Sequence, residues 1–339
     1  MCVFSRCLTG LATCTFLALA ACGQGDAPAA EKQAASVAEA QEAAARAEAL
    51  ETQKAAYEAA LAEAKASRGT GEPALWSLRD EDTTLYIMGT VHLLRPDLEW
   101  RSDAIDTALE EADTVVFEAD VTSQQAKSEM MRFISSKGMF TDGRQLTSLL
   151  SDLEKAELQK ALDHLGLPLG AIQPMKPWWA AVNLSVMQIQ QEGFDPNSGV
   201  EKVIEAEALA DGKSFAYLET IDEQLGRLAG MPDDEQVDFL IGSTESIKEG
   251  ADVLDVLVSE WVDGDVHGIG LLMANPDMIG SDEVYDALLK SRNEDWVGKI
   301  KAMLDEPGTR LIAVGAGHLA GEDSVIELLE QEGYEVSGP

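Results

Sequence analysis

The chain has 339 residues, 45% of them hydrophobic, which is enough for one large folded domain with extensions. Its 61 acidic and 25 basic residues give a formal net charge of −36 at pH 7. A surface with this charge repels phosphate, so we expect no nucleic-acid partner, and it favours divalent cations over anions.

Residues 1–22 have the features of an export signal. Arg6 supplies a positive charge, and an apolar run from about Leu8 to Ala20 follows that is too short for an ordinary transmembrane helix. The segment ends in Leu-Ala-Ala-Cys and resembles the lipobox of bacterial lipoproteins, in which the chain is cut before a cysteine that becomes lipidated. We therefore predict lipidation at Cys22, and Gly23 after it favours an outer-membrane lipoprotein that faces the periplasm of the cell envelope. The alternative is an ordinary secretory signal with a coincidental cysteine.

All four cysteines lie within this signal, so the rest of the chain has no disulfide framework, zinc-thiolate cluster or cysteine nucleophile. Residues 23–70 are rich in Ala, Glu and Gln, which favour helix, but large apolar residues are too sparse for a core-facing stripe. This pattern predicts a helical or partly disordered tether, with a weak coiled coil as the alternative. A folded domain over residues 71–339 follows.

Strand and helix patterns alternate along residues 71–339. We expect a hairpin (75–78 and 84–88), strands at 114–120, 214–218 and 310–314, and a last strand at 334–336. Helices are expected at 102–111, 199–210 and 324–331, and two long helical stretches at 122–190 and 221–304. This alternation predicts an α/β fold with a central mixed sheet, and the two long stretches predict a large helical cap over one side of it.

Two of the expected strands end in the same motif, Gly-x-x-His, at Gly89–His92 and Gly315–His318. Glycine accepts positive φ, so we expect it to allow a sharp turn at each strand end. Ligands of open α/β sheets bind at the carboxyl ends of the strands. We therefore predict that His92 and His318 face one pocket, where a neutral imidazole binds a metal or acts as a general base. His164 and His267 have polar, helical surroundings and are assigned to the surface or to packing.

Several carboxylates and one arginine are further candidates. Glu118 and Glu219 each follow an apolar strand and could complete a metal site or orient a water, although a salt bridge or a helix cap explains each equally well. Glu201 begins a helix, where its charge could simply offset the helix dipole. Arg292, next to Asn293 on an expected helix, could stabilise an oxyanion or a substrate carboxylate, with a surface position as the alternative.

The candidate ligands limit which metal ions and which hydrolase classes are expected. Two histidines with carboxylates suit Zn²⁺, Mn²⁺ or Co²⁺. The sequence has no His-Glu-x-x-His, P-loop or Gly-x-Ser-x-Gly motif, so most standard hydrolase signatures are absent. Trp178, Trp179 and Trp296 are expected in the core rather than at a substrate platform.

Taken in order, the motifs between about residues 74 and 336 resemble the TraB/GumN family, which is related to the TIKI metalloproteases. They are Gly89–His92, the strand before Glu118, Lys176-Pro177-Trp178, Gly199-Val200-Glu201, Leu218-Glu219-Thr220, Arg292-Asn293 and Gly315–Leu319 with Gly321. The resemblance implies an α/β fold shared more distantly with ChaN-like and erythromycin-esterase-like proteins. It also implies a divalent-metal site with His92, His318 and Glu118, and peptide-bond hydrolysis in the TIKI branch. Arg292 carries over as well, whereas Glu201 stands where many relatives are expected to have Asp.

Three functions remain open at this stage. The first is a metal-dependent hydrolase, a peptidase, of a peptide or small molecule, in which Glu219 holds or deprotonates water and Arg292 steadies the oxyanion. The second is a metal-free hydrolase in which a histidine activates water. The third is a non-enzymatic ligand-binding or envelope-assembly protein of the periplasm.

Overall fold

The computed structural model describes residues 44–45, 47–48, 51–52, 55–56, 58–67, 69–249, 252–273 and 281–339. Contacts divide the chain into two units, Met1–Thr52 and Gln53–Pro339. The described residues of the first unit are helical. The predicted signal with Cys22 lies outside the described residues, and so does much of the predicted tether. Within the part that is described, no helix combines the length and apolarity needed to cross a membrane.

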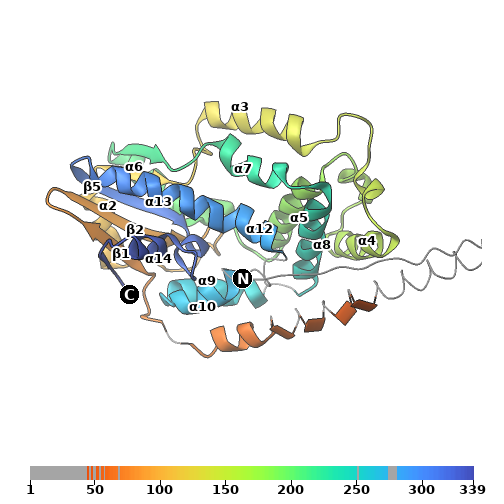
Figure 1. Cartoon of the computed structure of the whole chain (residues 1–339), viewed down its shortest axis with the longest axis horizontal. Helices are drawn as coiled ribbons and strands as arrows, with labels where there is room; N and C mark the ends of the chain where they lie inside the picture. Colours follow the sequence, from red (N-terminus) through yellow and green to blue (C-terminus); the bar gives the residue numbers. More distant parts are fainter. Residues whose placement is uncertain are drawn as a thin grey trace, which may run out of the picture. The chain divides into compact units, whose positions relative to one another are not determined.

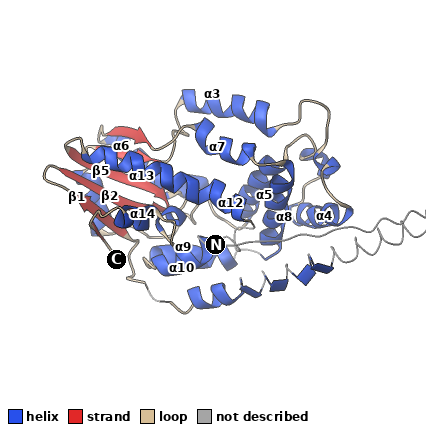
Figure 2. Cartoon of the chain, in the orientation of Figure 1, coloured by secondary structure: helices blue, strands red, loops and turns tan. Residues whose placement is uncertain are grey.

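The second unit is built on one mixed sheet of six strands in the order β4-β3-β5-β2-β1-β6 (Figure 2). The strands are β1 (Leu75–Arg79), β2 (Thr83–Thr90), β3 (Thr114–Phe117), β4 (Ser214–Tyr217), β5 (Gly308–Gly315) and β6 (Val336–Ser337). β4, β3, β5 and β2 are mutually parallel, whereas β1 runs antiparallel to both of its neighbours. The predicted mixed sheet is therefore confirmed, and its four parallel strands share one carboxyl edge.

The sheet is apolar on both faces because its central strands are apolar at consecutive positions. Successive side chains of a strand point to opposite faces. Leu311 and Ala313 accordingly belong to one core, and Ile312 and Val314 to the other. A strand without polar alternation is typical of a parallel sheet that is covered on both sides.

The helices of the described residues are, in chain order, α2 (Asp103–Glu111), α3 (Gln124–Phe133), α4 (Asp152–Leu165), α5 (Pro177–Gln191), α6 (Val200–Ala210), α7 (Ile221–Gly230), α8 (Asp233–Glu249), α9 (Asp252–Val262), α10 (Val266–Met273), α12 (Asp282–Tyr285), α13 (Ser291–Leu304) and α14 (Val325–Gln331). Short π and 3-10 turns join them at η1 (Ile134–Gly138), η2 (Leu146–Ser148), η3 (Leu169–Ala171), η4 (Pro196–Ser198), η5 (Asp286–Lys290) and η6 (Ala316–Leu319).

Nine of these helices form two groups. α2, α6, α9 and α10 contribute to the core on one face of the sheet, and α13 and α14 to the core on the other. α4, α5 and α8 pack on one another around a separate core and lie at the opposite end of this unit from the sheet (Figure 1). The predicted α/β fold with a helical part is thus confirmed.

The end of the stretch predicted as a tether packs on the sheet domain. Residues 58–64 are helical, and Ala60 and Ala64 are buried. The hydroxyl of Ser67 donates to a carboxylate oxygen of Glu260 on α9 over 3.1 Å. Residues 58–67 therefore belong by contact to the second unit.

Candidate functional site

The carboxyl edge of the four parallel strands gathers residues that are far apart in the sequence. β2 leads into His92, β5 into His318 on η6, β3 into Glu118 and β4 into Glu219. The backbone N–H of Glu219 donates to the carbonyl of Glu118 over 2.8 Å, which places these two residues side by side. A cavity of about 390 Å³ opens at this edge, and His92, Glu118, Arg292 and His318 line it.

The glycines at the strand ends permit close approach rather than a left-handed turn, which corrects our expectation. Gly315 has φ −51°, and Gly89 is not among the residues with positive φ. A Cβ on Gly315 would lie 3.1 Å from Glu118 Oε1, 3.6 Å from His318 Cδ2 and 3.7 Å from His92 Nε2. A Cβ on Gly89 would lie 3.0 Å from the Cα of Ala316. Both glycines are needed because side chains and backbone crowd around them, which a sequence alone does not reveal.

Gly199 likewise permits a close approach, here to the backbone of His92. Its own Cβ would lie 2.1 Å from the carbonyl oxygen of His92, a distance that no side chain tolerates. The N–H of Val200 donates to the carbonyl of Val91 over 3.1 Å. These contacts lock the first turn of α6, and with it Glu201, against the loop that carries His92.

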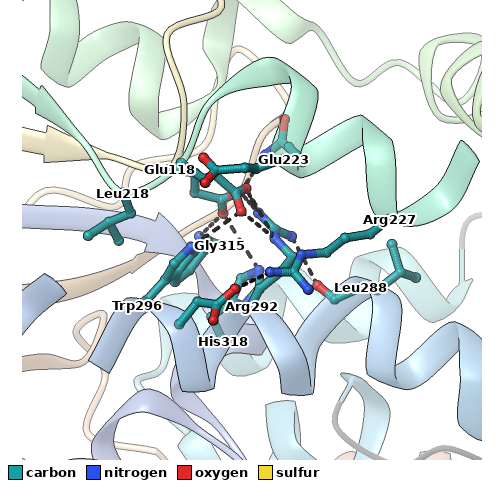
Figure 3. A network of polar contacts seen from close by, with 12 residues as sticks. Glu118, Leu218, Glu223, Arg227, Leu288, Arg292, Trp296, Gly315 and His318 are labelled. Carbon is teal, nitrogen blue, oxygen red and sulfur yellow. Dashed lines mark hydrogen bonds and ion pairs between the residues drawn. The ribbon is translucent and has the colours of Figure 1, made fainter. Parts of the chain in front are cut away.

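His318 has a fixed tautomer. Asn293 donates its Nδ2–H to the carbonyl of Asp323 over 2.7 Å, so its Oδ1 faces His318 Nδ1 at 2.6 Å. An amide oxygen only accepts, and His318 must therefore carry its hydrogen on Nδ1. The Nε2 of the neutral ring is left without a hydrogen and lies 3.8 Å from Glu118 Oε1. The ring also packs against Trp296, with centroids 4.3 Å apart (Figure 3).

His92 is oriented in the same way by a carboxylate. Its Nδ1 lies 2.5 Å from Glu201 Oε1, and Thr90 donates its hydroxyl to the same oxygen. Nε2 is thereby turned to the side of the ring where Gly315 lies. The His92 side chain is 62% exposed, whereas that of His318 is 5% exposed.

Arg292 holds the two glutamates together. Its Nη2 lies 2.5 Å from Glu118 Oε2 and 2.5 Å from Glu219 Oε1, and its Nε donates to both oxygens of Glu219. Nη1 donates to the carbonyl of Leu288 over 2.9 Å (Figure 3). Glu219 also accepts a hydrogen bond from the indole of Trp296 over 3.3 Å and does not line the cavity.

Glu118 is the carboxylate at the centre of the cavity's polar side. Burial by itself would raise its pKa, but Arg292, His318, His92 and the N–H of Gly315 outweigh burial and hold that pKa at about 2. The Gly315 N–H donates to Oε1 over 2.8 Å, and the Gln224 amide donates to Oε2 over 3.1 Å. Glu118 is therefore an anion at any physiological pH.

The two histidines have opposite charge states at neutral pH. The nearby charge of Glu201 and its hydrogen bond to the ring raise the pKa of His92 to about 9. Burial lowers the pKa of His318 to about 3, against the attraction of Glu118. One imidazole is therefore protonated and the other neutral.

The donor atoms at this edge are of the types that bind a divalent cation. His318 Nε2 and Glu118 Oε1 face each other without a hydrogen between them, and their 3.8 Å separation is near the ~3.3–3.6 Å between two ligands of a tetrahedral ion. Both Nδ1 atoms are held by an oxygen acceptor, which is the usual outer support of metal-binding histidines. Among the described residues, however, no three His, Cys, Asp or Glu side chains are gathered closely enough to hold an ion as they stand.

The other histidines and tryptophans singled out from the sequence lie outside the set of charged site residues. His164 and His267 are exposed, and Trp178 and Trp296 are buried. Asp323 was not singled out from the sequence, because its contribution is a backbone contact with Asn293. The metal-binding and catalytic roles expected for the site residues stay predictions.

The chain is similar in sequence to one protein family and to several known proteins. The model of the TraB/PrgY/gumN family matches residues 74–338. Protein YbaP of Escherichia coli (strain K12) is 23% identical over 244 residues, which cover 72% of this chain and 87% of YbaP. Metalloprotease TIKI1 is 24% identical in Danio rerio, covering 77% of this chain and 62% of that protein, and 24% identical in Homo sapiens, covering 77% and 61%. No solved structure gives a significant match. Because the family model spans most of the chain and includes both Gly-x-x-His motifs, the protein belongs to the TraB/PrgY/gumN family.

Proposed function

We propose that this protein is a metal-dependent hydrolase of peptide bonds. The observation that carries the proposal is the convergence of three side chains on Gly315: a Cβ there would lie 3.1 Å from Glu118 Oε1, 3.6 Å from His318 Cδ2 and 3.7 Å from His92 Nε2. The similarity to proteins named metalloproteases supports the same reading. This chain spans about three fifths of the length of the TIKI1 proteins, so the similarity does not extend to the whole of those proteins.

The three donors would hold a divalent ion, with Mn²⁺, Co²⁺ and Zn²⁺ as candidates. Such an ion supplies Lewis-acid polarisation of the scissile carbonyl and makes water more acidic. Asn293 and Glu201 keep the imidazoles turned toward the cavity by accepting from Nδ1. His92 must give up a proton before it can act as a ligand, and Glu201 is in contact with the Nδ1 side of that ring.

Arg292 would steady a developing oxyanion. It lines the cavity, and the hydrogen bonds it makes to described residues leave one of its five N–H groups, on Nη1, without an acceptor. Glu219 lies behind the guanidinium, so we assign it to positioning Arg292 rather than to proton transfer.

Metal content and peptide hydrolysis by the same preparations test this proposal. Wild type is dialysed against each ion beside His92→Ala, His318→Ala and the control His164→Ala, whose exposed ring lies outside the cavity. We expect one bound ion and turnover in wild type and the control, and neither in the two site variants. Full turnover in a chelated enzyme, or bound metal in His318→Ala, would refute it.

A second candidate is a metal-free hydrolase, which the opposite charge states of the histidines favour. Neutral His318 would take a proton from water, and protonated His92 would donate one to the leaving group, because paired groups with divergent pKa values suit base and acid. Activity that survives chelation and shows a loss near the pKa of His92 would select this mechanism.

We also propose that the chain is a lipoprotein anchored through Cys22 at the periplasmic side of the outer membrane. The support is the lipobox-like sequence before Cys22. Cys22→Ser should release the protein into the soluble periplasmic fraction and abolish incorporation of a radiolabelled fatty acid. Continued membrane association in that variant would contradict the anchor.

A further inference from the structure

The cavity has two chemically different walls. Its polar wall comes from the strand ends and from Arg292. A second, apolar part of the lining, called the apolar wall below, comes from three helical elements: Ile189 on α5, Leu254 and Leu257 on α9, and Leu288 and Leu289 on η5.

The apolar wall is held in place by the cores behind it. Ile189, Leu254 and Leu257 pack against the core that covers one face of the sheet. α9 is pinned to the sheet because the indole of Trp261 donates to the carbonyl of Gly89 over 2.9 Å. These side chains are only half-buried, so part of their apolar surface is left for a ligand.

The polar wall carries charged groups, and the apolar wall carries none. Arg292 forms ion pairs with Glu118 and Glu219, and His92 forms one with Glu201. The apolar residues that line the cavity offer no partner to a charged group that enters from the substrate. A charge there would lose its hydration without compensation.

We propose that this wall is a subsite for a large aliphatic or aromatic side chain of the substrate, next to the bond that is cleaved. The proposal rests on the hydrolase function above, and Leu254 and Leu257 are its specificity-determining residues. The cavity is large enough to take such a side chain in full. Binding of Leu or Phe should exceed that of Asp or Lys by at least about tenfold, the scale on which apolar pockets discriminate.

Binding of capped tripeptides Ala-X-Ala, with X as Leu, Phe, Ala, Asp or Lys, tests the subsite independently of turnover. The full chain is titrated in the presence of a chelator and followed by ligand-observed NMR, with the peptides checked for integrity. We expect Leu and Phe to bind best, Leu257→Asp to lose this preference and Leu209→Asp to keep it. Leu209 is the matched control because it is 69% exposed on α6, away from the cavity.

Leu257→Ala, a milder change, is measured beside Leu257→Asp, and circular dichroism confirms that each variant folds. Equal binding of all five peptides, binding of none, or an unchanged preference in Leu257→Ala and Leu257→Asp would overturn the subsite. Failure of the hydrolase function looks different: the apolar peptides bind with the expected order but remain uncut after metal is restored.

Discussion

Arg292→Ala should be the most destabilising single change at the site. The guanidinium is 8% exposed and separates Glu118, 11% exposed, from Glu219, 3% exposed. Removing it leaves two neighbouring carboxylates buried without their cation. Breaking a buried ion pair from one side costs about 3–5 kcal/mol. The depression of the Glu118 pKa to about 2 is consistent with this scale, since a shift of that size corresponds to ~3 kcal/mol shared among Arg292 and its other partners.

The sign of the pH dependence follows from that lowered pKa. Glu118 contributes stability above its unfolded pKa of about 4.5, and this contribution is lost as the pH falls through about 2. In the variant, burial raises the pKa of Glu118 instead, so the carboxylate protonates at higher pH. The difference in the free energy of unfolding between wild type and variant should therefore be largest at pH 7 and shrink on acidification.

Urea unfolding at pH 7 and at pH 4 measures this difference directly. Arg132→Ala serves as the control, because Arg132 is exposed and its nearest carboxylate, Glu129, lies 3.9 Å away. It should leave the urea midpoint almost unchanged. A loss below about 1 kcal/mol for Arg292→Ala at pH 7, or a loss that grows at pH 4, would refute the role assigned to this buried network.

Three further outcomes are expected. Gly199→Ala should destabilise the fold by about 1–3 kcal/mol because its Cβ would clash with the carbonyl of His92. The control Gly298→Ala, on an open helix surface, should be neutral or stabilising. The midpoints of thermal unfolding of the two variants and wild type measure this difference. Glu201→Gln should lower the pKa of His92 from about 9 in an NMR titration, and it should reduce stability at pH 6 but not above pH 9, because a raised histidine pKa stabilises only below it. Glu260→Gln should increase the urea midpoint at pH 7 and not at pH 4, because burial raises the pKa of Glu260 and its ionised form opposes folding; an equal gain at both pH values would contradict this.

The positions of the strands along the chain and the two Gly-x-x-His motifs could be predicted from the sequence. Apolar runs predicted the four parallel strands, because a buried parallel strand needs consecutive apolar residues, whereas the last strand was predicted at 334–336 and lies at Val336–Ser337. The general rule for strand ends then brought His92, Glu118 and His318 toward one edge. The position of β5 between β3 and β2 could not be predicted, because nothing in the sequence of a strand specifies which strands lie beside it.

Contacts across the sheet account for what the sequence did not reveal. Gly199 and Gly315 are glycines because of atoms more than a hundred residues away, and such neighbours leave no local signal. Glu219 follows its strand as expected, but its carboxylate turns to Arg292 instead of the cavity. Leu254 and Leu257 have the spacing of any core-facing helix, and only the packing of α9 beside β2 makes them part of the cavity wall.

The central place of β5 also bears on biosynthesis. This strand lies between β3 and β2, yet it is translated after all other strands except β6. Until residues 308–315 emerge, β2 and β3 each keep an open, apolar edge, which is the feature most prone to join with another chain. A chain interrupted before residue 308 therefore lacks His318 and leaves the apolar edges of β2 and β3 unpaired. Such truncated products should be substrates for chaperones and proteases rather than partly active forms.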